Sequence, residues 1–131
     1  MKKGFTLVEL LGVIVIIAVI ATIAAIAVDN SIKKGKESTC KAQKENIIEA
    51  AKTWQIDNSI TSNTQVYVNN SSQNNDLTKG GYLDENLKNP MTDEKYESNI
   101  YVQITIIEND NSDNQGYDYK LMKGNTEINC E

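Results

Sequence analysis

The 131-residue sequence contains no histidine and no arginine, and all 13 of its basic residues are lysines. Without histidine, neither a Ser-His-Asp triad nor a Cys-His pair can form, and histidine-ligated zinc is excluded as well. Without arginine, the chain has no bidentate clamp for phosphate. A glycine-rich phosphate-binding loop is also missing, because Gly80-Gly81 is an isolated pair. We therefore expect no enzymatic activity and no cofactor.

Acidic residues dominate the C-terminal part of the chain. After Lys52 there are 13 acidic residues and five lysines, whereas residues 29–52 hold six lysines and four acidic residues. A domain that binds nucleic acid needs a basic surface to neutralise the phosphates. The acidic C-terminal part therefore argues against nucleic acid as a partner.

One long uncharged segment contrasts with this polar composition. Residues 10–28 contain no charged side chain over 19 positions, which is long enough for a helix to cross a bilayer. Glu9 directly precedes the segment, and Lys2 and Lys3 precede Glu9. A carboxylate in the membrane-facing part of such a helix costs about 2.5–3.5 kcal/mol on insertion scales, so its presence indicates a function.

The order of residues at this N-terminus is similar to a known pattern. Residues 2–4, Lys-Lys-Gly, are followed by Phe-Thr-Leu-Val-Glu-Leu at residues 5–10. This arrangement resembles the N-terminus of type IV pilins and of the related pseudopilins of type II secretion and competence systems. The resemblance implies that a prepilin peptidase removes the leader, residues 1–4, by cutting between Gly4 and Phe5. It also implies N-methylation of Phe5 and a role for Glu9 as the charge that guides assembly into a filament.

The resemblance further implies the partners and the location of the chain. The subunit would be held by lipid in the cytoplasmic membrane of a bacterium, and would then polymerise with other copies or related pilins into a filament at the cell surface. Extraction from the membrane would depend on an assembly platform with a separate cytoplasmic ATPase, since nothing in this sequence binds nucleotide. Adhesion, motility, secretion and DNA uptake all stay open as roles of such a filament. The sequence also leaves open whether the chain is a major or a minor subunit.

Two local features differ from many pilins. Ile26 stands where they carry a proline, and no glycine occurs near Ala18. Both missing residues would weaken a helix locally. We therefore do not expect the partial melting of the helix that those residues are thought to permit in the filament.

Two other classes compete with the pilin interpretation. A secretory signal peptide also has a basic start and an apolar run, and Ala25-Ile26-Ala27 offers a small-x-small cleavage site. The apolar region of a signal peptide is typically about 7–15 residues, however, which is shorter than this run. The second alternative is a single-pass membrane-anchored extracellular binding module that does not polymerise. Such an anchor explains the length of the run but gives no reason for Glu9.

The fold is predicted to be α+β, with a long N-terminal helix packed on a small antiparallel sheet, as in pilins. No proline occurs before residue 90, so one helix is expected over residues 5–57. Its front half, residues 5–28, would span the membrane or form a filament core, and its back half, residues 29–57, is amphipathic. At 100° per residue, four apolar residues of the back half lie within about 60° of one another: Cys40, Ile47, Ala51 and Trp54.

The remaining chain divides into a connecting region, residues 58–99, and an antiparallel β-meander, residues 100–131. The connecting region is rich in asparagine and serine and is expected to contain one short strand, residues 65–68. Alternating apolar residues predict the strands of the meander. These strands are residues 100–107, 117–123 and 126–129, with Gly124-Asn125 as a two-residue hairpin turn.

An acidic, asparagine-rich turn is expected at residues 108–116. Asp110, Asp113 and Asp118 offer oxygen ligands to calcium, and some relatives in the secretion branch bind calcium near the C-terminus. With Gly116 at the sixth position of an EF-hand loop, however, Met122 occupies the position of the bidentate glutamate. We therefore favour a solvated turn and expect no metal site.

The chain has two cysteines, Cys40 on the apolar stripe of the helix and Cys130 near the C-terminus. An even number of cysteines in an exported domain suggests a disulfide. This bridge would be worth about 4–5 kcal/mol in the chain-entropy model. Two reduced, buried thiols are the alternative. In many pilins the bridge joins two cysteines of the head, so a bridge from helix to C-terminus differs from that arrangement.

Overall fold

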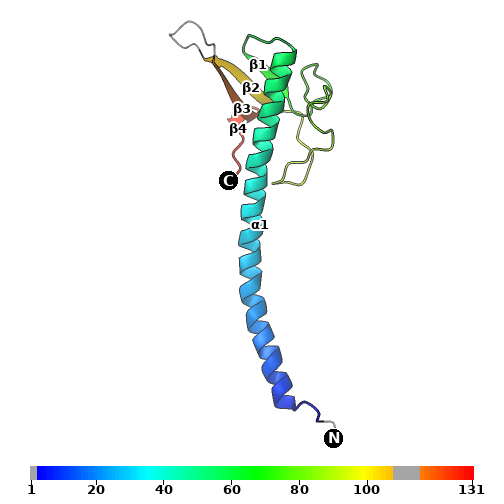
Figure 1. Ribbon diagram of the computed structural model, residues 1–131, viewed down its shortest axis with the longest axis vertical. Coiled ribbons are helices and arrows are strands. Elements are labelled where there is room, and N and C mark those ends of the chain that lie inside the picture. The colour runs from blue at the N-terminus through cyan, green and yellow to red at the C-terminus, as the bar shows by residue number, and fades with distance from the viewer. Residues whose placement is uncertain (1–2, 108–115) are drawn as a thin grey trace. The chain divides into compact units, whose positions relative to one another are not determined.

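The computed structural model describes residues 3–107 and 116–131, and it shows the predicted α+β layout (Figure 1). A single helix, α1, covers Leu7–Asp57. Four strands follow: β1 (Thr64–Tyr67), β2 (Ile100–Ile107), β3 (Gly116–Lys123) and β4 (Thr126–Glu127). Most of the predicted acidic turn, including Asp110 and Asp113, lies outside the described residues. The solvated turn therefore stays a prediction, with calcium binding as its alternative.

The chain divides into two compact units, Met1–Gly35 and Lys36–Glu131, and the boundary falls within α1. In the first unit every residue from 3 to 35 is exposed, although this part of α1 is strongly apolar, with a mean hydropathy of 3.1 over its best 18-residue window. Such a helix has the length and composition of a membrane span. Within the described residues 3–35 these apolar side chains stay exposed, which suits burial against lipid or another molecule.

The second unit is built on a four-stranded antiparallel sheet with the order β1-β2-β3-β4. Val66 of β1 pairs with Val102 of β2, which pairs with Leu121 of β3, and all three side chains are buried. The prediction of a three-stranded meander was therefore incomplete, because β1 adds a fourth strand beside β2. The last strand is also shorter than predicted, since β4 ends at Glu127.

The amphipathic stripe of α1 forms the helical side of the core, as its periodicity predicted. Cys40, Ile47, Ala51 and Trp54 are the buried apolar residues of α1, and Ile47 and Ala51 are completely buried. They pack with the buried side chains of the sheet and of the connecting region: Val66, Val68, Leu77, Tyr96, Ile100, Val102, Ile104 and Leu121. A sheet of this size needs the helix to cover its apolar face.

The connecting region between β1 and β2 is held by a buried carboxylate. Asp76, 1 % exposed, accepts hydrogen bonds from the backbone N–H groups of Asn70, Thr78 and Lys79 and from the Thr78 hydroxyl. The same segment runs along the free edge of β1, where the Tyr67 N–H donates to the Asn75 carbonyl and the Leu77 N–H donates to the Tyr67 carbonyl. The edge of β1 is therefore covered by the chain itself.

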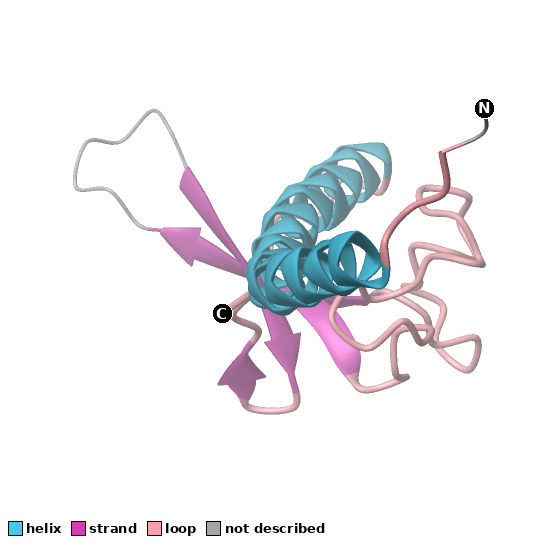
Figure 2. Ribbon diagram, turned by 90° about the horizontal axis from the view of Figure 1, so that it is seen from below, coloured by secondary structure: helices cyan, strands magenta, loops and turns pink. Residues whose placement is uncertain are grey.

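The strands and the connecting region lie on different sides of the back half of α1 (Figure 2). The hairpin between β3 and β4 turns at Gly124, whose φ of 58° lies in the left-handed region that glycine adopts without strain. This agrees with the predicted turn at Gly124-Asn125.

Candidate functional site

The residues around the expected cleavage junction are fully accessible. Gly4 and Phe5 lie in an irregular segment just before α1, and the Phe5 side chain is 91 % exposed. A Cβ atom built on Gly4 would meet no atom within 4 Å. The chain itself therefore offers no steric obstacle to a peptidase at the bond between these two residues.

Glu9 makes a reciprocal pair of hydrogen bonds with Thr6 at the start of α1. Its Oε2 atom accepts the Thr6 backbone N–H at 2.9 Å, and the Thr6 hydroxyl oxygen accepts the Glu9 backbone N–H at 3.3 Å. This is a capping box, which satisfies two N–H groups that have no partner inside the helix. Glu9 thus has a structural role in its own chain, in addition to the assembly role that the resemblance implies for its charge.

This role of Glu9 was not predicted, although the Thr-x-x-Glu spacing directly before an apolar run is the signature of a capping box. A carboxylate near a helix N-terminus is also favoured by the helix dipole. The capping box therefore gives Glu9 a purpose that is independent of any neighbour.

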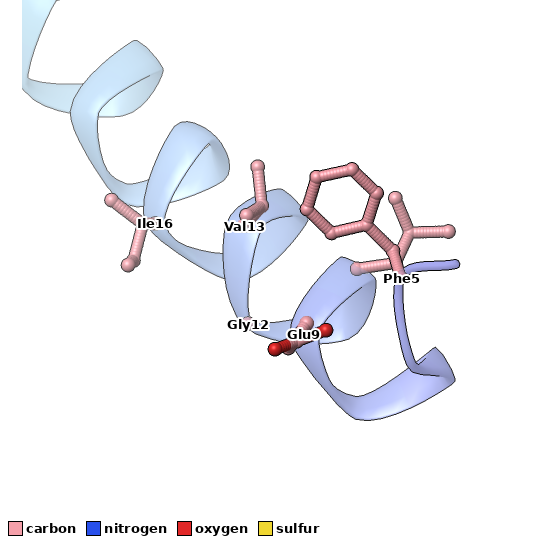
Figure 3. A pocket seen from close by; sticks show the side chains of 6 residues that line it. Phe5, Glu9, Gly12, Val13 and Ile16 are labelled. Atoms are coloured by element: carbon pink, nitrogen blue, oxygen red, sulfur yellow. The ribbon is translucent and has the colours of Figure 1, made fainter. Parts of the chain in front are cut away.

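A groove opens beside Glu9 on the surface of the first unit (Figure 3). It has a volume of about 570 Å³ and is lined by Phe5, Glu9, Leu10, Gly12, Val13 and Ile16. Apart from the Glu9 carboxylate, its lining side chains are apolar. In Figure 3 the Phe5 ring lies next to Val13, while Gly12 leaves a gap in the row of side chains beside Glu9.

The C-terminal end of the chain is attached to α1 in the second unit. The Sγ atoms of Cys40 and Cys130 are 2.01 Å apart, the length of a disulfide, and their Cα atoms are 5.7 Å apart. Beside them, Lys44 Nζ donates to the Ile128 carbonyl at 3.0 Å and lies 3.2 Å from Glu127 Oε1. Lys44 therefore holds β4 and the residue that follows it against α1.

No other cluster in the described part of the chain has the chemistry of a site. Residues 3–107 and 116–131 contain no group of three histidine, cysteine or acidic side chains that could hold a metal ion. Asp118, one of the suggested calcium ligands, lies 3.7 Å from the ammonium of Lys120. Buried side-chain nitrogen and oxygen atoms within these ranges all have a hydrogen-bond partner. Among these residues the N-terminal region is therefore the best candidate for function.

A comparison with known protein families points to the same N-terminal region as the candidate functional site. Residues 1–25 match the model of the prokaryotic N-terminal methylation motif, the hallmark of type IV pilins and pseudopilins. The long apolar helix and the antiparallel sheet give a pilin-like α+β layout, and the motif and the helix together suit a membrane-anchored pilin. It marks the chain as a prepilin-type substrate of a prepilin peptidase and suggests a structural rather than an enzymatic protein. No match was found among curated proteins or among solved structures.

Proposed function

We propose that the chain is a structural subunit of a type IV pilus or of a pilus-like filament, and that it polymerises through its N-terminal helix. The observation that carries this proposal is the exposed apolar half of α1, with the single carboxylate of Glu9 at the fifth residue after the expected cleavage junction. Neighbouring copies of the same helix would bury this apolar surface once the subunit leaves the lipid.

Assembly would be guided by charge. Cleavage after Gly4 frees an α-amine on Phe5, and that amine, once methylated, still carries a positive charge. In a water-poor core formed by packed helices, the Glu9 carboxylate is costly when it has no counter-charge. Pairing it with the Phe5 amine of a neighbouring copy offsets that cost and fixes the axial stagger between subunits.

The proposal implies a sequence of partners. The prepilin peptidase acts first, while lipid of the cytoplasmic membrane surrounds the apolar half of α1. An assembly platform with a separate cytoplasmic ATPase would then extract the subunit, and the second unit would be displayed on the outside of the cell. The acidic surface of that unit, with a net charge of −8 after Lys52, does not suit nucleic acid.

A single-pass membrane-anchored extracellular binding module remains the second candidate, and the capping box is the specific observation that favours it. Because Glu9 caps its own helix through Thr6, an anchor would also have a use for this residue. The two functions differ in one measurable consequence, since only a filament subunit needs the charge of Glu9.

Imaging of surface filaments tests the proposed function directly. Cells that express the chain should carry filaments in which antibodies against the second unit label the shaft, and cells lacking the chain should lose this labelled material. If the mature chain stays in the membrane fraction and no filament contains it, the binding-module function is correct instead.

A further inference from the structure

A cluster of lysines in α1 follows the uncharged segment of residues 10–28. It consists of Lys33, Lys34 and Lys36, called the lysine collar below, and all three residues are exposed. None of the ion pairs within residues 3–107 and 116–131 involves the lysine collar. Five other lysines in these ranges do pair with carboxylates: Lys44, Lys52, Lys88, Lys120 and Lys123. The charge of the lysine collar is therefore available to another molecule.

The sign of this charge differs from that of the chain on either side. Residues 10–28 are uncharged, and the part after Lys52 has a net charge of −8. Residues 29–36 carry the three lysines and one acidic residue, Asp29, which gives +2, and Glu37 follows them. An anionic membrane surface attracts basic residues beside a membrane span and repels an acidic domain. The lysine collar thus carries the charge that such a surface would hold.

The position of the lysine collar matches the depth of the lipid headgroups. Because α1 is continuous, Lys33 lies about 8 Å and Lys36 about 12 Å beyond Val28 along the helix, at about 1.5 Å per residue. The headgroup layer on each side of the hydrocarbon core is roughly 5–8 Å thick. Helical side chains tilt toward the N-terminus, here the direction of the bilayer, and the long lysine stem extends this reach. The ammonium groups can therefore contact the phosphates of the headgroups.

We propose that the lysine collar binds the phosphates of anionic phospholipids at the outer surface of the cytoplasmic membrane. This surface is continuous with the apolar half of α1, which has the length and composition of a membrane span. The inference goes beyond the filament function, because it concerns the subunit while it is still in the membrane. Once Lys2 and Lys3 are removed with the leader, the lysine collar holds the first basic side chains of the mature chain.

The arrangement of the three lysines favours lipid over the other anionic surface that this protein offers, the acidic second unit of another copy. At 100° per residue, Lys34 and Lys36 lie on opposite sides of Lys33, so the lysine collar covers an arc of about 160° around α1. Lipid surrounds a helix and meets such an arc completely. A protein docked on one face of α1 would meet a narrower stripe.

The lipids that stay bound to the purified chain test this proposal. The mature full-length chain is mixed with micelles containing equal amounts of zwitterionic phosphatidylcholine and anionic phosphatidylglycerol, isolated again, and its lipids are counted by mass spectrometry. Phosphatidylglycerol should be enriched about fivefold, which corresponds to the attraction of one lysine to an anionic surface. The triple variant Lys33→Gln, Lys34→Gln, Lys36→Gln should show no enrichment. High salt should also abolish the enrichment of the wild type, because it screens exposed charges.

A matched control removes the same charge elsewhere. Lys41, Lys79 and Lys95 are also exposed, and none of the ion pairs in the described ranges involves them. The triple variant Lys41→Gln, Lys79→Gln, Lys95→Gln should therefore keep the fivefold enrichment. Replacing the three residues of the lysine collar by arginine should keep it as well, because the charge is retained.

Each other outcome would overturn the proposal. Equal amounts of the two lipids on the wild-type chain would show that the lysine collar does not select anionic headgroups. An equal loss in both glutamine variants would show that only the total charge matters. If the lysine collar variant keeps the enrichment but no longer enters filaments, the three lysines bind the acidic unit of a second copy instead. Since lipid selection is measured without filaments, failure of the proposed function would leave this inference intact.

Discussion

The hydroxyl of Tyr96 donates a hydrogen bond to Oε1 of Gln43 in α1, with a distance of 2.8 Å between atoms that are 53 residues apart in sequence. Two further tyrosines bind the same helix in this way, since Tyr82 donates to Asp57 and Tyr119 donates to Gln55. Tyrosine hydroxyls from the connecting region and from β3 therefore hydrogen-bond to polar side chains of α1. Each combines an apolar ring with a hydrogen bond at its tip.

The first prediction concerns the stability of the second unit at high pH. Burial raises the pKa of Tyr96 from its ordinary value of 10.0 to about 12. Between these values the unfolded chain has lost the phenol proton and the folded chain still holds it, so stability falls as the pH rises through this window. In Tyr96→Phe this part of the fall should disappear. Thermal unfolding of the detergent-solubilised chain below and above pH 10 measures the effect.

Tyr101→Phe is a matched control for Tyr96→Phe. It also removes a phenol that is hydrogen-bonded, to the Gly124 carbonyl, but Tyr101 lies on the face of the sheet away from the helix. Each variant should lose about 1 kcal/mol at neutral pH through the missing hydrogen bond. An equally steep fall above pH 10 in wild type and Tyr96→Phe would show that burial of Tyr96 does not set the pH dependence.

The second prediction concerns the charge of Glu9. Glu9→Gln keeps an oxygen that can accept the Thr6 N–H, so the start of α1 should be preserved. Insertion into the membrane should be equal or easier, because the charge is gone. The variant should be cleaved after Gly4 and yet fail to enter filaments, because the Phe5 amine of a neighbouring copy loses its counter-charge, at a cost of several kcal/mol.

Electron microscopy of a strain lacking the chain, complemented with each variant, measures this effect. Val8→Ala is the control, since it removes only a small apolar contact next to Glu9 and should still polymerise. Restoration of normal filament number and length by Glu9→Gln alone would contradict the charge pairing.

The third prediction concerns processing of the precursor. The mature chain should begin at Phe5 and carry one additional methyl group on its α-amine, as N-terminal mass spectrometry of membrane-extracted protein would show. Gly4→Leu should accumulate as uncleaved precursor in the membrane, because the resemblance to prepilins implies a small residue before the cleaved bond. A chain that begins at Met1 or at Val28 would contradict the assignment to pilin-like proteins.

The fourth prediction concerns Cys40 and Cys130, which are 90 residues apart in sequence. We expect non-reducing peptide mapping to find them joined, and reduction to lower the stability of the second unit by about 4–5 kcal/mol in the chain-entropy model. Thermal unfolding with and without reductant measures this loss. The variant with both cysteines replaced by serine should not respond to reductant. Complete alkylation of both thiols in unreduced native protein would exclude the bridge.

The parts of the fold that follow from local periodicity could be predicted from the sequence. The stripe of Ile47, Ala51 and Trp54 repeats at helical spacing, and β2 has an apolar residue at every second position over residues 100–106. Neither pattern depends on distant parts of the chain. The methylation motif could also be recognised from the sequence, because its residues are contiguous.

The parts that depend on distant contacts could not be predicted. The strand β1 has four residues, and 32 residues separate it from β2, so nothing local indicated that the two strands pair. Asp76 gave no sign that it would be buried, because its partners are backbone N–H groups that any sequence offers. The contact of Lys44 could not be predicted for a similar reason, since its acceptor is the backbone carbonyl of Ile128.

The cover over the free edge of β1 affects how these molecules can join one another. An open strand edge invites a strand from another chain, and this is a common route to linear polymers and to aggregates. Here residues 75–77 occupy that edge, and the opposite edge strand, β4, has only two residues. The covered edge cannot take up a foreign strand, and the short one is a poor template for it. In the proposed filament, neighbouring subunits would then have little opportunity to exchange strands.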